Sequence, residues 1–367
     1  MKSNYDILGN HIRLIDIRNR ESIAGRVLGI NIDKFFMPSV ANVIGTDLSK
    51  YKLITKGKFA CNPMHVGRDE RLPVALYDEE EPAIVSPAYF MFEVIDNSIL
   101  NEDYLMMWFR RPEFDRICWL HTDGSVRGGI TWDDICRLEL PIPPIEEQLE
   151  IVNSYKAITD RIALKQQIND NLEATASAIY KKMFVEDIDT SNLPVEWQIT
   201  ALENIAELSA GGDRPYVYSD SQTEVCQVPI YSNGIDKEGL YGYTDKAKIF
   251  DESVTVSARG TVGYVFLREE PYVPIVRLIS VMPNTDYVTA KFLYFALAAI
   301  DLHSTGTSQQ QITVPDFKKR QIIVPNKTSM LCFTERIEPL FQTIRQNKNE
   351  INSLIALQAN YLALLSC

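Results

Sequence analysis

Histidine and cysteine are scarce in this chain, and neither is spaced for the sites it usually builds. Four histidines lie far apart along 367 residues, and the six cysteines form no Cys-x-x-Cys pair. Zinc sites and disulfide frameworks are recognised by characteristic spacings of these residues. We therefore expect no metal site and no disulfide, and we interpret the cysteines as buried or incidental thiols. A nucleophile paired with a histidine base has equally little to build on.

Glycine-rich phosphate loops and long apolar runs are missing as well. Neither Gly-x-x-x-x-Gly-Lys-Ser/Thr nor Gly-x-Gly-x-x-Gly after a strand occurs, which argues against ATP or nicotinamide chemistry in this chain. No apolar stretch approaches the ~20 residues of a membrane span, and the N-terminus lacks the apolar core of a secretory signal. The sequence predicts a cytoplasmic protein with no membrane contact, no catalytic residues and no cofactor of its own.

Basic residues are fewer than acidic residues in this chain. Lysine and arginine total 37 against 49 acidic residues, which gives a formal net charge of -12. Duplex DNA is bound largely by lysine and arginine that neutralise phosphates, so the overall charge counts against DNA binding. A large acidic chain can nevertheless carry local basic faces, and a subunit of a complex can leave phosphate contacts to its partners. The charge therefore does not exclude a DNA-binding function.

An internal repeat organises the chain. Residues 121–143 read HTDGSVRGGITWDDICRLELPIP and residues 303–325 read HSTGTSQQQITVPDFKKRQIIVP, which align without a gap at an offset of 182 residues. Each copy follows an apolar helical stretch, at 104–109 and 292–297, and precedes a long helical pattern. The matched positions include His121 with His303, Gly124 with Gly306, Ile130 with Ile312, Thr131 with Thr313, Asp134 with Asp316, and Pro143 with Pro325. Self-similarity at a fixed offset predicts two related domains.

The segments before the long helices mix strand and helix signals. Residues 1–140 and 195–325 contain β-branched runs separated by turn residues, such as the strand-like 253–257. Within the repeat, 131–134 and 313–316 fit a capping box, in which a threonine hydroxyl and a carboxylate satisfy the first helical turn. Each box is expected to begin a short helix that leads into a terminal strand.

Two long segments show the 3.5-residue period of a coiled coil. In the central one the seam comprises Ile151, Tyr155, Ile158, Ile162, Leu172, Ala176, Ile179 and Met183, interrupted by Lys165 and Asn169. In the C-terminal one it comprises Ile337, Phe341, Ile344, Ile351, Ile355, Leu362 and Leu365, interrupted by Lys348 and Gln358. We expect the two helices to pair with each other, antiparallel; the alternative is two ordinary amphipathic helices packed on separate domains.

The predicted fold class is therefore α/β (α+β), with two mixed α/β domains related by an internal repeat and two long helices that form an antiparallel coiled coil. The predicted boundaries are 1–144 for the first domain, 145–186 for the central helix, 187–325 for the second domain and 326–367 for the C-terminal helix.

The loops after the two paired histidines are the main binding candidates, because they occupy the same place in the two copies of the repeat but differ in sequence. Arginine commonly reads guanine, glutamine reads adenine, and serine or threonine can hold phosphate; the alternative is that these are plain polar turns. Candidate DNA contacts in these loops are His121, Ser125, Arg127, His303, Thr307, Ser308, Gln309 and Gln310, although a buried histidine that orders the loop is the alternative for His121 and His303. Asn233, in the turn 232–234, is a further candidate. Candidate phosphate contacts are Lys52, Lys56, Lys58, Arg68, Lys246, Lys248 and Arg259.

The helical segments carry a family resemblance. Pro143-Pro-Ile-Glu-Glu-Gln148 and the stretch 172–184 resemble the central conserved region of Type I restriction-modification specificity (S) subunits, the HsdS family. Glu338-Pro-Leu-Phe341 and the residues after it look like the C-terminal conserved region of that family. Shorter matches, including Tyr231-Ser-Asn-Gly234 and Ser257-Ala-Arg-Gly-Thr261, extend the resemblance over nearly the whole chain.

The resemblance implies a non-catalytic subunit with two target-recognition domains, each reading one half of an interrupted site in double-stranded DNA. It implies that the helices dock two methyltransferase (M) subunits, which bind S-adenosylmethionine, and that ATP and Mg belong to a further restriction/translocase (R) subunit. The segment 357–365 departs from the Leu-Arg-Asp stretch common in relatives, which bears on docking there. The alternatives are a DNA-recognition region of a fused restriction-methylation enzyme and a coiled-coil scaffold without a nucleic-acid role.

Overall fold

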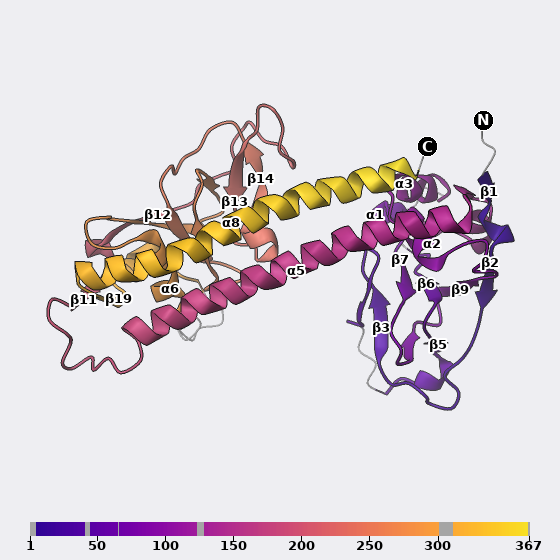
Figure 1. Cartoon of the computed structure of the whole chain (residues 1–367), viewed down its shortest axis with the longest axis horizontal. Coiled ribbons are helices and arrows are strands. Elements are labelled where there is room, and N and C mark those ends of the chain that lie inside the picture. The colour runs from indigo at the N-terminus through magenta and orange to yellow at the C-terminus, as the bar shows by residue number, and fades with distance from the viewer. Residues whose placement is uncertain (1–4, 41–44, 65, 123–127, 301–310, 366–367) are drawn as a thin grey trace. The chain divides into compact units, whose positions relative to one another are not determined.

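The computed structural model describes residues 5–40, 45–64, 66–122, 128–300 and 311–365. The chain divides into two compact units (Figure 1). Unit 1 comprises residues 1–165 and 349–367, and unit 2 comprises residues 166–348. The long helices α5 (Ile145–Phe184) and α8 (Lys327–Leu364) each contribute one part to unit 1 and the other to unit 2.

Unit 1 is a mixed α/β domain. Its strands are β1 (Tyr5–Ile7), β2 (Ile12–Ile15), β3 (Val27–Ile30), β4 (Phe36–Pro38), β5 (Lys52–Ile54), β6 (Lys58–Cys61), β7 (Val74–Tyr77), β8 (Ala83–Val85), β9 (Phe90–Val94) and β10 (Glu139–Pro141). Strands β2-β9-β6-β7 form an antiparallel sheet, β4-β3-β8-β5 form a second sheet in which β3 and β8 run parallel, and β1 pairs with β10. Cross-strand aromatic packing stabilises the first sheet: the rings of Phe59 and Phe92 stack at 5.0 Å between centroids.

Short helices cover the first sheet of unit 1. The short helical elements are η1 (Leu8–Asn10), η2 (Leu48–Lys50), α1 (Val66–Asp69), α2 (Glu102–Phe109), α3 (Pro112–Leu120) and α4 (Trp132–Cys136). Helix α2 begins where the Asn101 side chain accepts a hydrogen bond from the Tyr104 backbone N–H, and α3 begins at Pro112. Trp108 and Phe109 of α2 are buried in the hydrophobic core.

Unit 2 contains the strands β11 (Gln198–Ala201), β12 (Ala206–Ala210), β13 (Val228–Tyr231), β14 (Leu240–Thr244), β15 (Ser253–Val256), β16 (Val265–Arg268), β17 (Val273–Pro274), β18 (Ile279–Pro283) and β19 (Gln321–Val324). Its short helical elements are η3 (Leu202–Asn204), η4 (Asp236–Gly239), α6 (Ala290–Ala298) and α7 (Val314–Lys318). Its core packs α6 and the first half of α8 against the sheet.

The two units repeat one topology. The order β12-β18-β15-β16 in unit 2 matches β2-β9-β6-β7 in unit 1, and β14-β13-β17 matches β4-β3-β8 with the same parallel and antiparallel pairings. The pair β11–β19 matches β1–β10. Thr131 and Thr313 both cap the short helix before the last strand, with a complete capping box formed by Thr131 and Asp134. The predicted internal repeat and mixed α/β fold class are confirmed.

The seam predicted for the central helix is confirmed along α5, where each predicted position is buried or half-buried. Along α8 the prediction is wrong at two positions, because Lys348 and Ile355 are exposed. The preceding residues, Asn347 and Leu354, take their places on the covered side. The other seam positions predicted for the C-terminal helix are buried or half-buried: Ile337, Phe341, Ile344, Ile351, Gln358 and Leu362 in α8, and Leu365 directly after its end.

Side-chain contacts join α5 to α8 in antiparallel order. In unit 1, Gln358 Nε2 donates to Thr159 Oγ1 at 2.7 Å, and Lys165 Nζ lies 2.9 Å from Glu350 Oε2. In unit 2, Asn347 Nδ2 donates to Asn169 Oδ1 at 2.8 Å. Partners rise along one helix as they fall along the other, as the antiparallel prediction requires.

Candidate nucleic-acid interface

The tips of both histidine loops lie outside the described residues. This applies to Ser125, Arg127, His303, Thr307, Ser308, Gln309 and Gln310, whose DNA contacts stay predictions. His121 lies at the edge of the first loop, where its backbone N–H ends α3 by donating to the carbonyls of Ile117 and Cys118. It is exposed and leads directly into the loop.

Two of the predicted phosphate contacts in unit 1 differ sharply in exposure. The Lys52 side chain is 8% exposed, donates from Nζ to the Tyr89 carbonyl at 2.7 Å, and has its pKa lowered by burial. A phosphate contact would require this ammonium to leave its enclosed position. Lys56 is exposed and pairs with Glu80, and such solvent-screened surface ion pairs contribute little to stability. Lys56 can therefore exchange its carboxylate for a phosphate at little cost.

The other two predicted cations of unit 1 are also paired. Lys58 binds Glu93, and this hydrogen bond lowers the pKa of the Glu93 carboxyl, which also pairs with Arg13. Arg68 pairs with its neighbour Asp69. Each ion pair reduces the positive charge that unit 1 presents to an anionic ligand, so the clearest candidate surface lies in unit 2.

Asn233 holds two loops of unit 2 together. Its side-chain oxygen accepts from the Ala258 N–H at 2.8 Å, and its side-chain nitrogen donates to the Val276 carbonyl at 2.6 Å. The Asn233 carbonyl also accepts from the Thr261 hydroxyl. The side chain predicted to contact DNA therefore binds main chain, and it fixes the loops that carry Arg259 and residues 276–277.

A third loop, residues 212–218, is fastened at both ends. At its start, the Gly211 N–H donates to the Leu278 carbonyl at 2.8 Å, and a Cβ on Gly211 would lie 2.8 Å from the Ile275 nitrogen. At its end, Ser219 and Tyr243 exchange backbone hydrogen bonds of 3.0 and 2.8 Å. Both ends of the loop are therefore fixed by backbone hydrogen bonds to neighbouring segments of unit 2.

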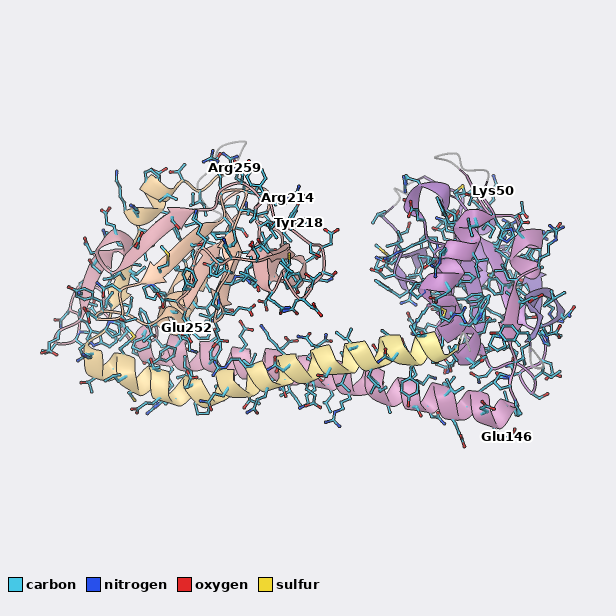
Figure 2. All side chains as sticks on the ribbon, turned by 90° about the horizontal axis from the view of Figure 1, so that it is seen from above. Lys50, Glu146, Arg214, Tyr218, Glu252 and Arg259 are labelled. Carbon is cyan, nitrogen blue, oxygen red and sulfur yellow. The ribbon has the colours of Figure 1, made fainter. Side chains whose placement is uncertain are left out.

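These three loops present arginine and tyrosine to solvent. Arg214, Arg259 and Arg277 are exposed and form no ion pair with any described residue. The Arg214 guanidinium lies 4.6 Å from the centroid of the Tyr218 ring, and Tyr216 is fully exposed. Figure 2 shows Arg214, Tyr218 and Arg259 on one side of unit 2, away from Glu252.

The two lysines of unit 2 that were predicted to contact phosphate lie in a segment that also exposes carboxylates. Lys246 and Lys248 are exposed and form no ion pair among the described residues, but Asp245 and Asp251 are exposed in the same segment. Neighbouring carboxylates offset the local positive potential at these lysines.

The arginine loops suit recognition of a planar, anionic polymer. A guanidinium presents five N–H donors in a rigid plane that can bind phosphate or the edge of a base. Exposed tyrosine rings add surfaces for stacking. Arg214, Tyr216, Tyr218 and Arg277 were missed from sequence, although the stretch GGDRPYVYSD carries a signal, namely paired glycines followed by arginine and alternating aromatics.

Other chemistry finds no comparable site in the described part of the chain. No three histidine, cysteine, aspartate or glutamate side chains there are grouped to hold a metal ion. No described helix is both long and apolar enough to pass through a lipid bilayer. The Cys118 thiol is buried, which raises its pKa to about 12 and disfavours the reactive thiolate.

Comparisons with known proteins are consistent with this geometry. Residues 73–174 and 194–355 match the family model described as the Type I restriction modification DNA specificity domain. A protein of Mycoplasma pneumoniae named as a type I specificity subunit is 27% identical over 252 residues, which cover 67% of this chain and 66% of that protein. The match therefore spans slightly less than two thirds of that relative.

More distant relatives match over a greater length. The HindI specificity subunit of Haemophilus influenzae is 21% identical, with 87% of each chain covered. Among solved structures, the S subunit of a Type I restriction-modification system from M. genitalium matches with a TM-score of 0.57 at 14% identity, covering 98% of this chain and 95% of that one. This last similarity concerns the fold alone.

Proposed function

Because the chain belongs to the family of Type I restriction-modification DNA specificity domains, we propose that it is the sequence-specific DNA-binding subunit of such a system. Each unit reads one half of a bipartite site in double-stranded DNA. Catalysis belongs to partner subunits, and this chain supplies the sequence specificity.

One observation carries the proposal: two units of the same topology present different side chains at equivalent places. The connection from β6 to β7 in unit 1 carries the exposed Arg68, which pairs with Asp69, whereas the equivalent connection from β15 to β16 in unit 2 carries the exposed Arg259, which forms no ion pair with a described residue. A repeated frame with different surfaces suits a protein that reads two different half-sites. Base edges specify a sequence, while phosphate contacts only position the protein.

The helices α5 and α8 are the proposed docking surface for two methyltransferase subunits. Both expose large apolar side chains to solvent in unit 1, with Leu164 56% exposed and Ile355 50% exposed. Exposed apolar residues on a helical surface favour a protein partner. The partners would bring S-adenosylmethionine, and a restriction/translocase subunit would bring ATP and Mg.

Selection of bound sequences from a random duplex library tests this function. The full chain, co-purified with its methyltransferase subunits, should enrich two short conserved blocks separated by a gap of constant length. Omitting the chain from the complex is the control, and it should abolish enrichment. Enrichment of nothing would favour a coiled-coil scaffold, and enrichment of one uninterrupted block would contradict the bipartite reading.

A further inference from the structure

We propose that Arg214 reads a guanine in the half-site of unit 2, and that Tyr218 is the positioning residue that aims it. The inference rests on the proposed function and assigns a specificity determinant within it. Among the described residues of these three loops, Arg214 has an exposed guanidinium that lies over an aromatic ring.

The ring beneath Arg214 is itself held in place. The Tyr218 ring packs against the Tyr241 ring at 5.7 Å between centroids, and its hydroxyl donates to the Asp220 carboxylate. A guanidinium lying over an aromatic face keeps its N–H edges pointing outward in its own plane. That plane is the one in which arginine donates two hydrogen bonds to O6 and N7 of guanine.

Arg214 follows the exposed Asp213 in sequence but forms no ion pair with any carboxylate of the described residues. The nearby Asp220 is occupied by the Tyr218 hydroxyl, and Arg214 forms no ion pair in the described part of the chain. Two other arginines of unit 2 are engaged in ion pairs: Arg345 with Glu338 and Glu269, and Arg268 with Glu238. Arg214 therefore reaches DNA without first breaking an ion pair.

The loop that carries Arg214 is already ordered. Its two ends are fixed by backbone hydrogen bonds at Gly211 and Ser219, and the Thr244 hydroxyl donates to the Val217 carbonyl at 2.7 Å in between. A preorganised loop loses little conformational freedom when it binds, so more of the interaction energy is available for discrimination.

Tyr216 and the two other arginines complete the arrangement. Tyr216, two residues after Arg214 in sequence, is fully exposed, and its ring can cover a base or sugar. Arg259 and Arg277 are carried by the loops that Asn233 joins, and they are suited to phosphates, which position the protein without specifying sequence. Loss of Arg214 should therefore change the sequence preference, whereas loss of Arg259 or Arg277 should weaken binding to all sequences.

The test is sequence selection with the full chain in complex with its methyltransferase subunits. Arg214→Ala should lower the preference for guanine at one position of one half-site by about 10- to 100-fold, leaving the other half-site unchanged. Arg214→Lys should not restore it, since a lysine ammonium is a point charge without the planar fork. Arg20→Ala, which removes an exposed arginine of unit 1 outside the long helices, is the matched control and should leave the half-site of unit 2 unchanged.

The role of Tyr218 is separable from folding. Tyr218→Phe keeps the ring and should preserve guanine selection, whereas Tyr218→Leu should weaken it by about 2- to 5-fold at the same position only. A uniform loss of affinity over all sequences in Arg214→Ala would make Arg214 a phosphate contact and overturn the inference. Wild-type protein that selects no site would instead refute the proposed function, so the two failures are distinguishable.

Discussion

Two asparagine side chains meet between α5 and α8 in unit 2. Asn347 is 4% exposed and donates to Asn169 Oδ1 at 2.8 Å. A polar pair in a helical seam costs stability but favours one register over others, because shifting the helices would leave the amides unsatisfied. The nearby ion pair of Lys165 with Glu350 in unit 1 adds a second polar contact between the same helices.

We predict that removing one of these amides is worse than removing both. Asn347→Leu should lower the free energy of unfolding by about 1–3 kcal/mol, because it removes the hydrogen-bond partner of Asn169. Asn169→Leu combined with Asn347→Leu should recover most of that loss or exceed wild-type stability. Urea unfolding of the full chain measures both, and a double variant that loses as much as the two single variants together would mean that the amides belong to a larger network.

Sequence could identify the seam but not each of its members. Lys165 and Asn169 were correctly placed on the covered side of α5. On α8, the step after Ile344 can be three or four residues in a 3.5-residue repeat, and the longer step led to Lys348 instead of Asn347. The same choice then led to Ile355 instead of Leu354. Only the contacts with the facing helix decide between the two steps.

At the scale of elements, the equivalent helices α2 and α6 each form an ion pair with a long helix, but the positive and negative partners are exchanged between the two units. Asp103 and Lys291 are each the second residue of their helices, α2 and α6. Asp103 lies 2.6 Å from Lys156 of α5, and Lys291 lies 3.2 Å from Glu338 of α8. Lys156 and Glu338 are separated by 182 residues, the offset of the repeat (338 − 156 = 182). Each unit thus uses the same docking contact with the charges exchanged.

The two lysines should differ in their contribution to stability. Lys156→Met should cost at most about 1 kcal/mol, because the side chain is 55% exposed and the ion pair is solvated. Lys291→Met should cost about 2–3 kcal/mol, because its side chain is 5% exposed and faces Glu252, Glu269 and Glu338, which would be left together.

Thermal unfolding of the two lysine variants, followed at several ionic strengths, checks this comparison. The loss from Lys291→Met should shrink as salt screens the three carboxylates. Equal losses in the two variants would show that Lys291 acts through packing of its aliphatic chain rather than through its charge.

At the scale of the whole molecule, one short repeat was enough to predict the duplication. Local signals such as the capping residues Thr131 and Thr313 marked both copies, because capping depends on residues close together in sequence. The strand order could not be predicted, since β2 pairs with β9 across 75 or more residues and no local pattern records that partnership. Arg259 was predicted as a phosphate contact, but its grouping with Arg277 was missed for the same reason: Asn233 joins segments near residues 258 and 276.

The continuity of α5 and α8 through both units leads to a prediction about the gap between half-sites. A heptad inserted after Gln167 in α5 and another after Lys348 in α8 would keep the 3.5-residue seam in phase. Each helix would lengthen by about 10 Å, roughly three base pairs of B-form DNA. Sequence selection with the methyltransferase complex should return the same two half-sites with a correspondingly longer gap. Insertion into α5 alone is the control, and it should destabilise the protein by offsetting Asn169 from Asn347. An unchanged gap with retained affinity in the doubly inserted protein would show that the helices do not set the spacing.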